Sequence, residues 1–162
     1  MFPAPLLLLA RTVLAQAREK GLRIATAESC TGGLIAGLLT EIPGSSDVLD
    51  RGFVVYSNDA KSDLLGIPAK LIDEHGAVSE AVARAMAEGA VANSNAEVAV
   101  AVTGIAGPGG GTARKPVGLV DIAAAREGGA ILREAHRFGD IGRSEIRLKS
   151  VEAALMLLRQ LL

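Results

Sequence analysis

The feature that most constrains the fold of this chain is the segment 97–103, in which small apolar side chains follow one another almost without interruption. A strand without apolar–polar alternation is buried on both faces, which is typical of a sheet covered by helices on both sides. Two more apolar runs, at 22–25 and 53–56, predict strands of the same kind. The run at 53–56 is expected to lie in a central strand over 48–56.

Segments with helical periodicity alternate with these strands. Near the N-terminus the spacing of Leu6, Leu9 and Val13 predicts an amphipathic helix rather than a signal peptide, because no basic segment precedes the short apolar run. We expect helices over 5–20, 31–40, 80–92 and 143–162, two short helices after Ser57 and Pro68, and strands over 22–26, 48–56, 97–103, 117–125 and 130–138. The four-residue link 126–129 predicts an antiparallel hairpin. The chain 1–162 is therefore predicted to be one α/β domain, a three-layer α/β/α sandwich with a mixed sheet.

Composition excludes several classes of function. The formal net charge of -1 gives no reason to expect nucleic-acid binding, and four aromatic residues are too few for a base-stacking platform. No segment is long and apolar enough for a membrane span, so no membrane partner is expected. The single cysteine excludes an internal disulfide and fits a cytoplasmic protein. No His, Cys or carboxylate spacing indicates a metal site, and no cofactor is implied.

The stretch 25–33 carries the strongest chemical signal. It places Glu28, Ser29, Cys30 and two glycines between an apolar strand and the predicted helix 31–40. The N-terminus of a helix offers free N–H groups that stabilise an oxyanion, so we interpret Ser29 as a catalytic nucleophile. Cys30 is a rival nucleophile, but it has no histidine nearby in sequence and is interpreted as a packing residue.

A serine nucleophile needs a base. The sequence places His75 at a predicted helix end and His136 in the middle of a predicted strand, so both are interpreted as structural residues and neither as the base. Lys61 follows a buried strand, and partial burial would leave it a neutral amine able to accept the serine proton. An ordinary solvated lysine is the alternative that residue type alone favours. Tyr56, the only tyrosine, either stabilises charge or packs in the core.

A glycine-rich loop from Thr103 through Gly104, Ala106 and Gly107 presents consecutive amides, suited either to an anion or to a flexible surface loop. It lacks the residues and the following helix of a Walker loop. The positive charges of Arg114, Lys115 and Arg143 are candidates for holding a phosphate. Because the segments around Ser29, Lys61 and Thr103 each follow a strand, we expect them to converge at one edge of the sheet.

Four separated motifs cover nearly the whole chain: TAESCTGG at 26–33, RGFVVYSN at 51–58 with Lys61, HGAVS at 75–79, and TGIAGP at 103–108 with KPVG at 115–118. Together they resemble the C-terminal domain of the CinA competence/damage-inducible family, in its stand-alone form as a nicotinamide-nucleotide amidase (NMN deamidase). No activity of the N-terminal domain of longer members is implied.

The resemblance implies a serine–lysine amidase that converts nicotinamide mononucleotide to nicotinate mononucleotide and ammonia in pyridine nucleotide salvage. It implies Ser29 as nucleophile, Lys61 as base and Tyr56 as an assisting residue. It also implies a possible homodimer. The substrate-binding residues that it implies are Cys30, Thr31, Gly32, Thr103, Gly104, Ala106, Gly107 and Arg143. A non-catalytic nucleotide-binding or sensor module, with Ser29 only capping a helix, is the alternative.

Overall fold

The computed structural model describes all 162 residues of the chain. Its elements follow the predicted alternation: α1 (Ala4–Glu19), β1 (Ile24–Glu28), α2 (Leu34–Thr40), η1 (Ser45–Asp47), β2 (Leu49–Val54), α3 (Asn58–Leu65), α4 (Ala69–His75), α5 (Glu80–Ala92), β3 (Val98–Gly104), β4 (Leu119–Arg126), β5 (Ile131–Arg137) and α6 (Arg143–Arg159). No helix is long and apolar enough to cross a membrane.

The five strands form one mixed sheet in the order β2-β1-β3-β4-β5. The strand β1 pairs in parallel with both β2 and β3, whereas β4 is antiparallel to both β3 and β5. The predicted mixed sheet and the closing hairpin are confirmed. The expected central position of the 48–56 strand is wrong, because β2 is an edge strand. Its apolar residues are therefore only partly covered, and half of the Val54 surface is exposed.

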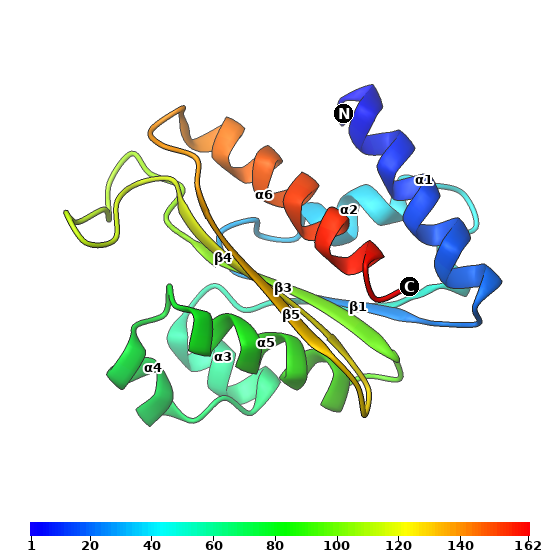
Figure 1. The fold of residues 1–162 in the computed structure, drawn as a ribbon, viewed down its shortest axis with the longest axis horizontal. Coiled ribbons are helices and arrows are strands. Elements are labelled where there is room, and N and C mark those ends of the chain that lie inside the picture. Colours follow the sequence, from blue (N-terminus) through cyan, green and yellow to red (C-terminus); the bar gives the residue numbers. More distant parts are fainter.

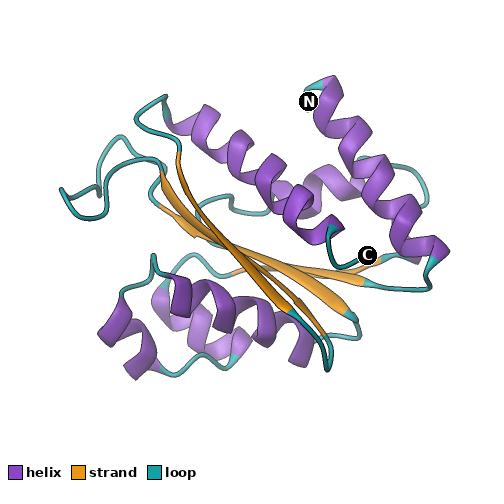
Figure 2. Cartoon of the chain, viewed as in Figure 1, coloured by secondary structure: helices purple, strands orange, loops and turns teal.

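Helices cover both faces of the sheet and complete the three predicted layers (Figures 1 and 2). Helices α1, α2 and α6 lie on one face, over a core cluster of 27 buried residues. Helices α3, α4 and α5 lie on the other, over a cluster of 16 buried residues with many alanines. The small side chains of β1 and β3 allow the second helix layer to pack close to the sheet.

Local signals place most helix boundaries. The hydroxyls of Ser57 and Ser79 accept hydrogen bonds from the N–H groups of Ala60 and Val82, so both serines cap helices as the sequence predicts. The second helix is shorter than predicted, since it begins at Leu34 and not at residue 31. The preceding glycines, with φ values of 58° at 32 and 95° at 33, adopt a left-handed turn instead.

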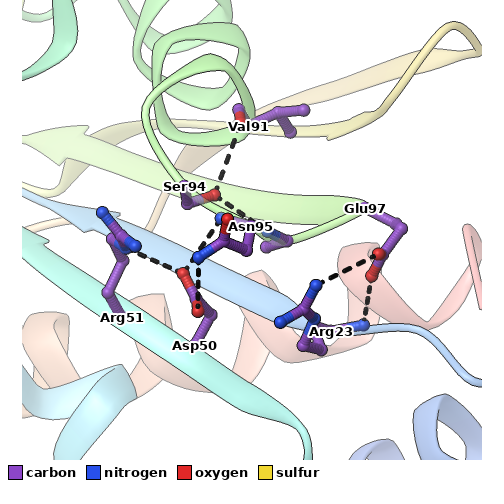
Figure 3. Close-up of polar contacts among 8 residues, drawn as sticks. Arg23, Asp50, Arg51, Val91, Ser94, Asn95 and Glu97 are labelled. Carbon is purple, nitrogen blue, oxygen red and sulfur yellow. Dashed lines mark hydrogen bonds and ion pairs between the residues drawn. The ribbon is translucent and has the colours of Figure 1, made fainter.

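A polar cluster joins the amino ends of the parallel strands (Figure 3). At the start of β2, Asp50 accepts hydrogen bonds from the Asn95 N–H and the Arg51 guanidinium, and the Asn95 contact contributes most to lowering the Asp50 pKa. Glu97, just before β3, accepts from the Arg23 N–H, just before β1. These contacts fix the sheet at the end opposite to the carboxyl ends of the same strands.

Candidate active site

The carboxyl ends of β1, β2 and β3 and the segments that follow them enclose a cavity of about 210 Å³. Ten residues line it: Ser29, Cys30, Tyr56, Asn58, Lys61, Ala77, Val78, Thr103, Gly104 and Arg143. The predicted convergence of three polar loops at one sheet edge therefore occurs. A larger hollow of about 490 Å³ lies beside the β4–β5 hairpin, but its ionisable residues are all exposed.

The centre of the cavity is a contact between a hydroxyl and an amine. Ser29 directly follows β1, Lys61 lies in the second turn of α3, and Ser29 Oγ is 3.3 Å from Lys61 Nζ. Only 1% of the Lys61 surface is exposed, against 9% for Ser29. Burial lowers the Lys61 pKa below its ordinary value of 10.5, and no carboxylate lies within ion-pair distance of its amine. The alternative of a solvated Lys61 is therefore wrong.

The partners of Lys61 Nζ suit a neutral amine. The amine donates to the carbonyl oxygens of Val55, at 3.0 Å, and Tyr56, at 3.4 Å. An uncharged amine has two N–H donors and one lone pair. With both donors taken by carbonyls, the lone pair remains for the Ser29 hydroxyl. The segment that follows β2 thus holds the Lys61 amine beside the Ser29 hydroxyl.

The N-terminus of α2 is closed by Glu28 and is not free for substrate. The buried Glu28 carboxylate accepts hydrogen bonds from the N–H groups of Gly33, Ile35 and Ala36, at 2.9–3.0 Å. The prediction that amides at this helix terminus stabilise an oxyanion is therefore wrong. The carboxylate uses these donors to fix the strand–turn–helix connection that carries Ser29.

Two other amides in the turn remain free. The N–H groups of Cys30 and Thr31 donate no hydrogen bond, whereas the neighbouring N–H of Ser29 donates to Val102 O. The Cys30 side chain points into the apolar core, and burial raises its thiol pKa to about 11. A thiol that remains protonated at neutral pH is a poor nucleophile, so packing is the role that the surroundings of Cys30 favour.

Arg143 forms the rim of the cavity. At the first turn of α6, it donates from Nη1 to Gly107 O at 2.8 Å and from Nη2 to the Tyr56 phenol at 3.3 Å. The phenol is largely exposed, with 63% of the Tyr56 surface accessible. Tyr56 therefore does not pack in the core, and its hydroxyl and the guanidinium together present polar groups at the mouth.

The other predicted binding residues divide into two groups. Thr103 lines the cavity and donates to Ala77 O at 2.8 Å, and Gly104 lies beside it. Thr31, Gly32, Ala106 and Gly107 do not line the cavity. The loop beyond Gly104 acts here mainly through the Gly107 carbonyl, which holds Arg143.

Lys115 is not free to hold a phosphate in this arrangement. Its amine donates to the carbonyl oxygens of His75, at 2.8 Å, and Val78, at 2.7 Å. It thereby braces the segment between α4 and α5 that forms one wall of the cavity. His75 ends α4, and His136 contacts Glu134 within β5, so both histidines lie outside the cavity as expected.

The structure also identifies residues that sequence reasoning missed. Asn58, Ala77 and Val78 line the cavity, and each lies in a motif segment without an obvious chemical role in the sequence. Arg147 donates to the carbonyl oxygens of Cys30 and Thr31, both at 3.0 Å. These partners are more than one hundred positions away from Arg147 in the chain, so no local pattern could reveal the contact.

Comparisons with known proteins agree with this fold. The family model described as the CinA C-terminal domain matches residues 7–162. A CinA-like protein of Syntrophobacter fumaroxidans is 53% identical over 145 residues, which are 90% of this chain and 34% of that protein. The chain therefore spans about a third of the length of such curated relatives.

Two solved structures show the same similarity over whole chains. A competence/damage inducible protein from Agrobacterium tumefaciens superposes with a TM-score of 0.98 at 55% identity, covering 99% of this chain and 98% of that one. A CinA superfamily protein from Escherichia coli gives a TM-score of 0.92 at 31% identity, covering 100% of this chain and 94% of that one.

Proposed function

Because the chain belongs to the CinA C-terminal domain family, we propose that it hydrolyses the carboxamide of nicotinamide mononucleotide to nicotinate mononucleotide and ammonia. The observation that carries this proposal is the 3.3 Å contact between Ser29 Oγ and the buried Lys61 Nζ. A hydroxyl beside a desolvated amine is the arrangement required by nucleophilic catalysis without a histidine. The motifs around both residues resemble those of nicotinamide-nucleotide amidases.

In the proposed reaction, Ser29 Oγ attacks the amide carbon while Lys61 Nζ takes the hydroxyl proton. The N–H of Cys30, a residue that lines the cavity, is the donor proposed to stabilise the negative oxygen of the tetrahedral intermediate. Lys61 then passes the proton to the amide nitrogen, and ammonia leaves. A water molecule attacks the resulting ester with Lys61 again as base, which releases the nicotinate product and restores Ser29.

Substrate recognition is proposed to depend on the rim of the cavity. The Arg143 guanidinium, held by Gly107 O and the Tyr56 phenol, is oriented by two contacts at the mouth. A fixed guanidinium binds a phosphate through parallel hydrogen bonds, and Arg143 also lies in the first turn of α6, where the helix dipole favours an anion. The nucleotide phosphate would lie there while the pyridine ring enters toward Ser29.

Release of ammonia from nicotinamide mononucleotide by the purified chain tests the proposal directly. Ser29→Ala and Lys61→Met should each reduce kcat by about 10³-fold or more, because nucleophile and base act as one unit. For the same reason, the double variant should be no slower than either single variant. Thermal unfolding of each variant checks that the fold is retained.

Two matched controls use exposed residues of the same types. Ser46→Ala and Lys70→Met alter an exposed serine and an exposed lysine and should leave kcat unchanged. Near-full ammonia release by Ser29→Ala or Lys61→Met would refute the assigned roles. Tight binding of the nucleotide by the unaltered chain without ammonia release would favour a sensor module instead.

A further inference from the structure

We propose that Ala77 and Val78 form the surface against which the pyridine ring of the substrate packs, and that Lys115 is the positioning residue that holds this surface in place. The inference rests on the proposed amidase function. It adds a subsite for the ring to the groups that hold the amide and the phosphate. Lys115 does not line the cavity, so it acts through the residues that it contacts.

The lining of the cavity offers little apolar surface. Of the ten lining residues, Ala77 and Val78 are the only aliphatic ones. Cys30 belongs to the apolar core cluster, and Tyr56 is largely exposed at the mouth. In a ligand pocket, apolar side chains supply the contact area and a few polar groups fix the orientation. The segment 77–78 is therefore the part of this lining that suits one face of an aromatic ring.

This segment is held by side chains rather than by regular secondary structure. It lies between α4 and α5, and the four consecutive carbonyl oxygens from 75 to 78 each accept a hydrogen bond from a side chain. Lys115 Nζ donates to the first oxygen, at 2.8 Å, and to the last, at 2.7 Å. The Ser79 hydroxyl donates to Gly76 O and the Thr103 hydroxyl to Ala77 O, both at 2.8 Å. The shape of this wall therefore depends mostly on residues from distant parts of the chain.

The Thr103 contact places the wall beside the proposed nucleophile. Thr103 follows Val102 in β3, and Val102 O accepts the Ser29 N–H at 3.0 Å. The Ala77 carbonyl is thus tied to the strand end that also holds Ser29. A ring packed on Ala77 and Val78 lies in the same cavity as Ser29 Oγ, so its carboxamide can approach the hydroxyl.

The surroundings of Lys115 favour this role over the binding of a phosphate. Its amine is half-buried, and no carboxylate lies within ion-pair distance of it. Hydrogen bonds from a charged donor are stronger than those between neutral groups, so its two carbonyl contacts hold the wall firmly. Gly76 lies between these carbonyls with a φ of 79°, and an added Cβ there would be 2.8 Å from Lys115 Nζ. The amine therefore packs closely against the bend of the segment.

Steady-state kinetics separate contact with the ring from contact with the phosphate. Lys115→Met should raise KM for nicotinamide mononucleotide about ten-fold, the loss expected when one face of a ring loses its apolar contact. The value of kcat should change less than about three-fold, because the ring contact is the same in the ground state and the transition state. The inhibition constant of nicotinamide riboside, which lacks the phosphate, should rise by the same factor as KM.

Two variants provide the comparison. Arg143→Met should raise KM for the nucleotide but leave the inhibition constant of the riboside unchanged. Lys149→Met alters an exposed lysine of α6 and should change neither constant. A rise in Lys115→Met that is confined to the nucleotide would show that Lys115 binds the phosphate, and it would overturn the inference. An unchanged KM in Lys115→Met would do the same.

A double-variant cycle tests whether Lys115 acts through the wall. Val78→Thr keeps the shape of the side chain but replaces a methyl group by a hydroxyl, and it should raise KM about three-fold. Because both changes affect one contact, the double variant with Lys115→Met should raise KM by less than the product of the two single effects. Val54→Thr, at a half-exposed valine of β2, is the matched control and should leave KM unchanged. Effects that multiply fully would mean that Lys115 acts elsewhere.

Nuclear magnetic resonance provides a readout independent of turnover. Gly76 and Ser79 share peptide units with the two carbonyls that Lys115 contacts, so their ¹H–¹⁵N resonances should shift in Lys115→Met and stay in place in Lys149→Met. Nicotinamide riboside added to the unaltered chain should shift the Val78 methyl resonances. If the unaltered chain released no ammonia, the proposed function would fail, and these resonances would still decide the inference. Unmoved Gly76 and Ser79 resonances, or unmoved Val78 methyls, would contradict it.

Discussion

At the scale of single residues, the site depends on a lysine whose charge the fold disfavours. Sequence reasoning alone favoured a solvated Lys61, because lysines are rarely buried. The structure encloses it almost completely and gives its amine two carbonyls and a hydroxyl, with no carboxylate. Burial is a property of residues packed around Lys61 from several elements, so it could not be predicted from the sequence near it.

The lowered Lys61 pKa predicts a pH dependence of both activity and stability. Amidase activity should rise with pH as the amine loses its proton, with a midpoint below 10.5. Between the folded pKa and 10.5, the unfolded chain binds one more proton than the folded chain, so the free energy of unfolding should also rise with pH.

Comparison with Lys61→Met isolates this contribution. The variant carries no titrating group at this position, so the difference in unfolding free energy between the two proteins should depend on pH within that window. Urea denaturation at a series of alkaline pH values measures it. A difference independent of pH would mean that the amine is not desolvated in the folded chain.

At the scale of elements, the connection from β1 to α2 is organised by the Glu28 carboxylate. One of its oxygens accepts from the N–H groups of Gly33 and Ile35, and the other from Ala36 N–H and the Thr26 hydroxyl. Since these donors belong to both ends of the turn, the carboxylate holds the turn that carries Ser29 in one shape.

Glu28→Gln should destabilise the protein by about 3 kcal/mol, because hydrogen bonds to a charged group contribute about 1.5–3 kcal/mol. The side-chain NH₂ group of the glutamine would face N–H donors. The Thr26 hydroxyl can accept a hydrogen bond from it instead of donating one, but the Ala36 N–H can only donate. Glu41→Gln, an exposed residue at the other end of α2, is the matched control and should have almost no effect. Urea denaturation that places both variants within about 0.5 kcal/mol of the unaltered chain would contradict this role.

Local signals predicted elements well and their surroundings poorly. Ser79 and Gly21 marked helix ends because capping is chemistry between near neighbours in sequence. The run at 53–56 predicted a strand correctly, but it indicated a central position for what is an edge strand. The two glycines at 32 and 33 were expected inside a helix, although their left-handed conformation delays its start. The first error concerns the place of a strand in the sheet, and the second concerns the local backbone conformation of two glycines.

At the scale of the whole molecule, the site takes groups from all three layers. Ser29 comes from the end of a sheet strand, Lys61 from the helix layer on one face, and Arg143 and Arg147 from the layer on the other. The motifs predicted which segments meet, because loops after neighbouring parallel strands share one edge. Arg143 of α6 was among the predicted site residues, but the contacts of Arg147 could not be predicted, since they depend on how a helix far along the chain packs.

The position of α3 within its layer should therefore control the reaction, because α3 carries Lys61, and Gly89 offers a way to change it. Gly89 lies in α5 against the last residue of α3, and an added Cβ would overlap the Leu65 backbone oxygen and lie 2.9 Å from Leu65 Cβ. Alanine favours a helix by about 1 kcal/mol over glycine, but overpacking against backbone costs about 1–3 kcal/mol. Gly89→Ala should thus destabilise the protein and displace α3, which carries Lys61.

A second helical glycine separates the two effects. At Gly37, in α2, an added Cβ would meet only the Phe2 ring, at 3.8 Å, so Gly37→Ala should stabilise the protein by up to about 1 kcal/mol. In urea denaturation, Gly89→Ala should therefore lower the free energy of unfolding and Gly37→Ala should raise it. The value of kcat should fall only in Gly89→Ala. Unchanged kcat in a destabilised Gly89→Ala would mean that the Ser29–Lys61 contact tolerates movement of α3.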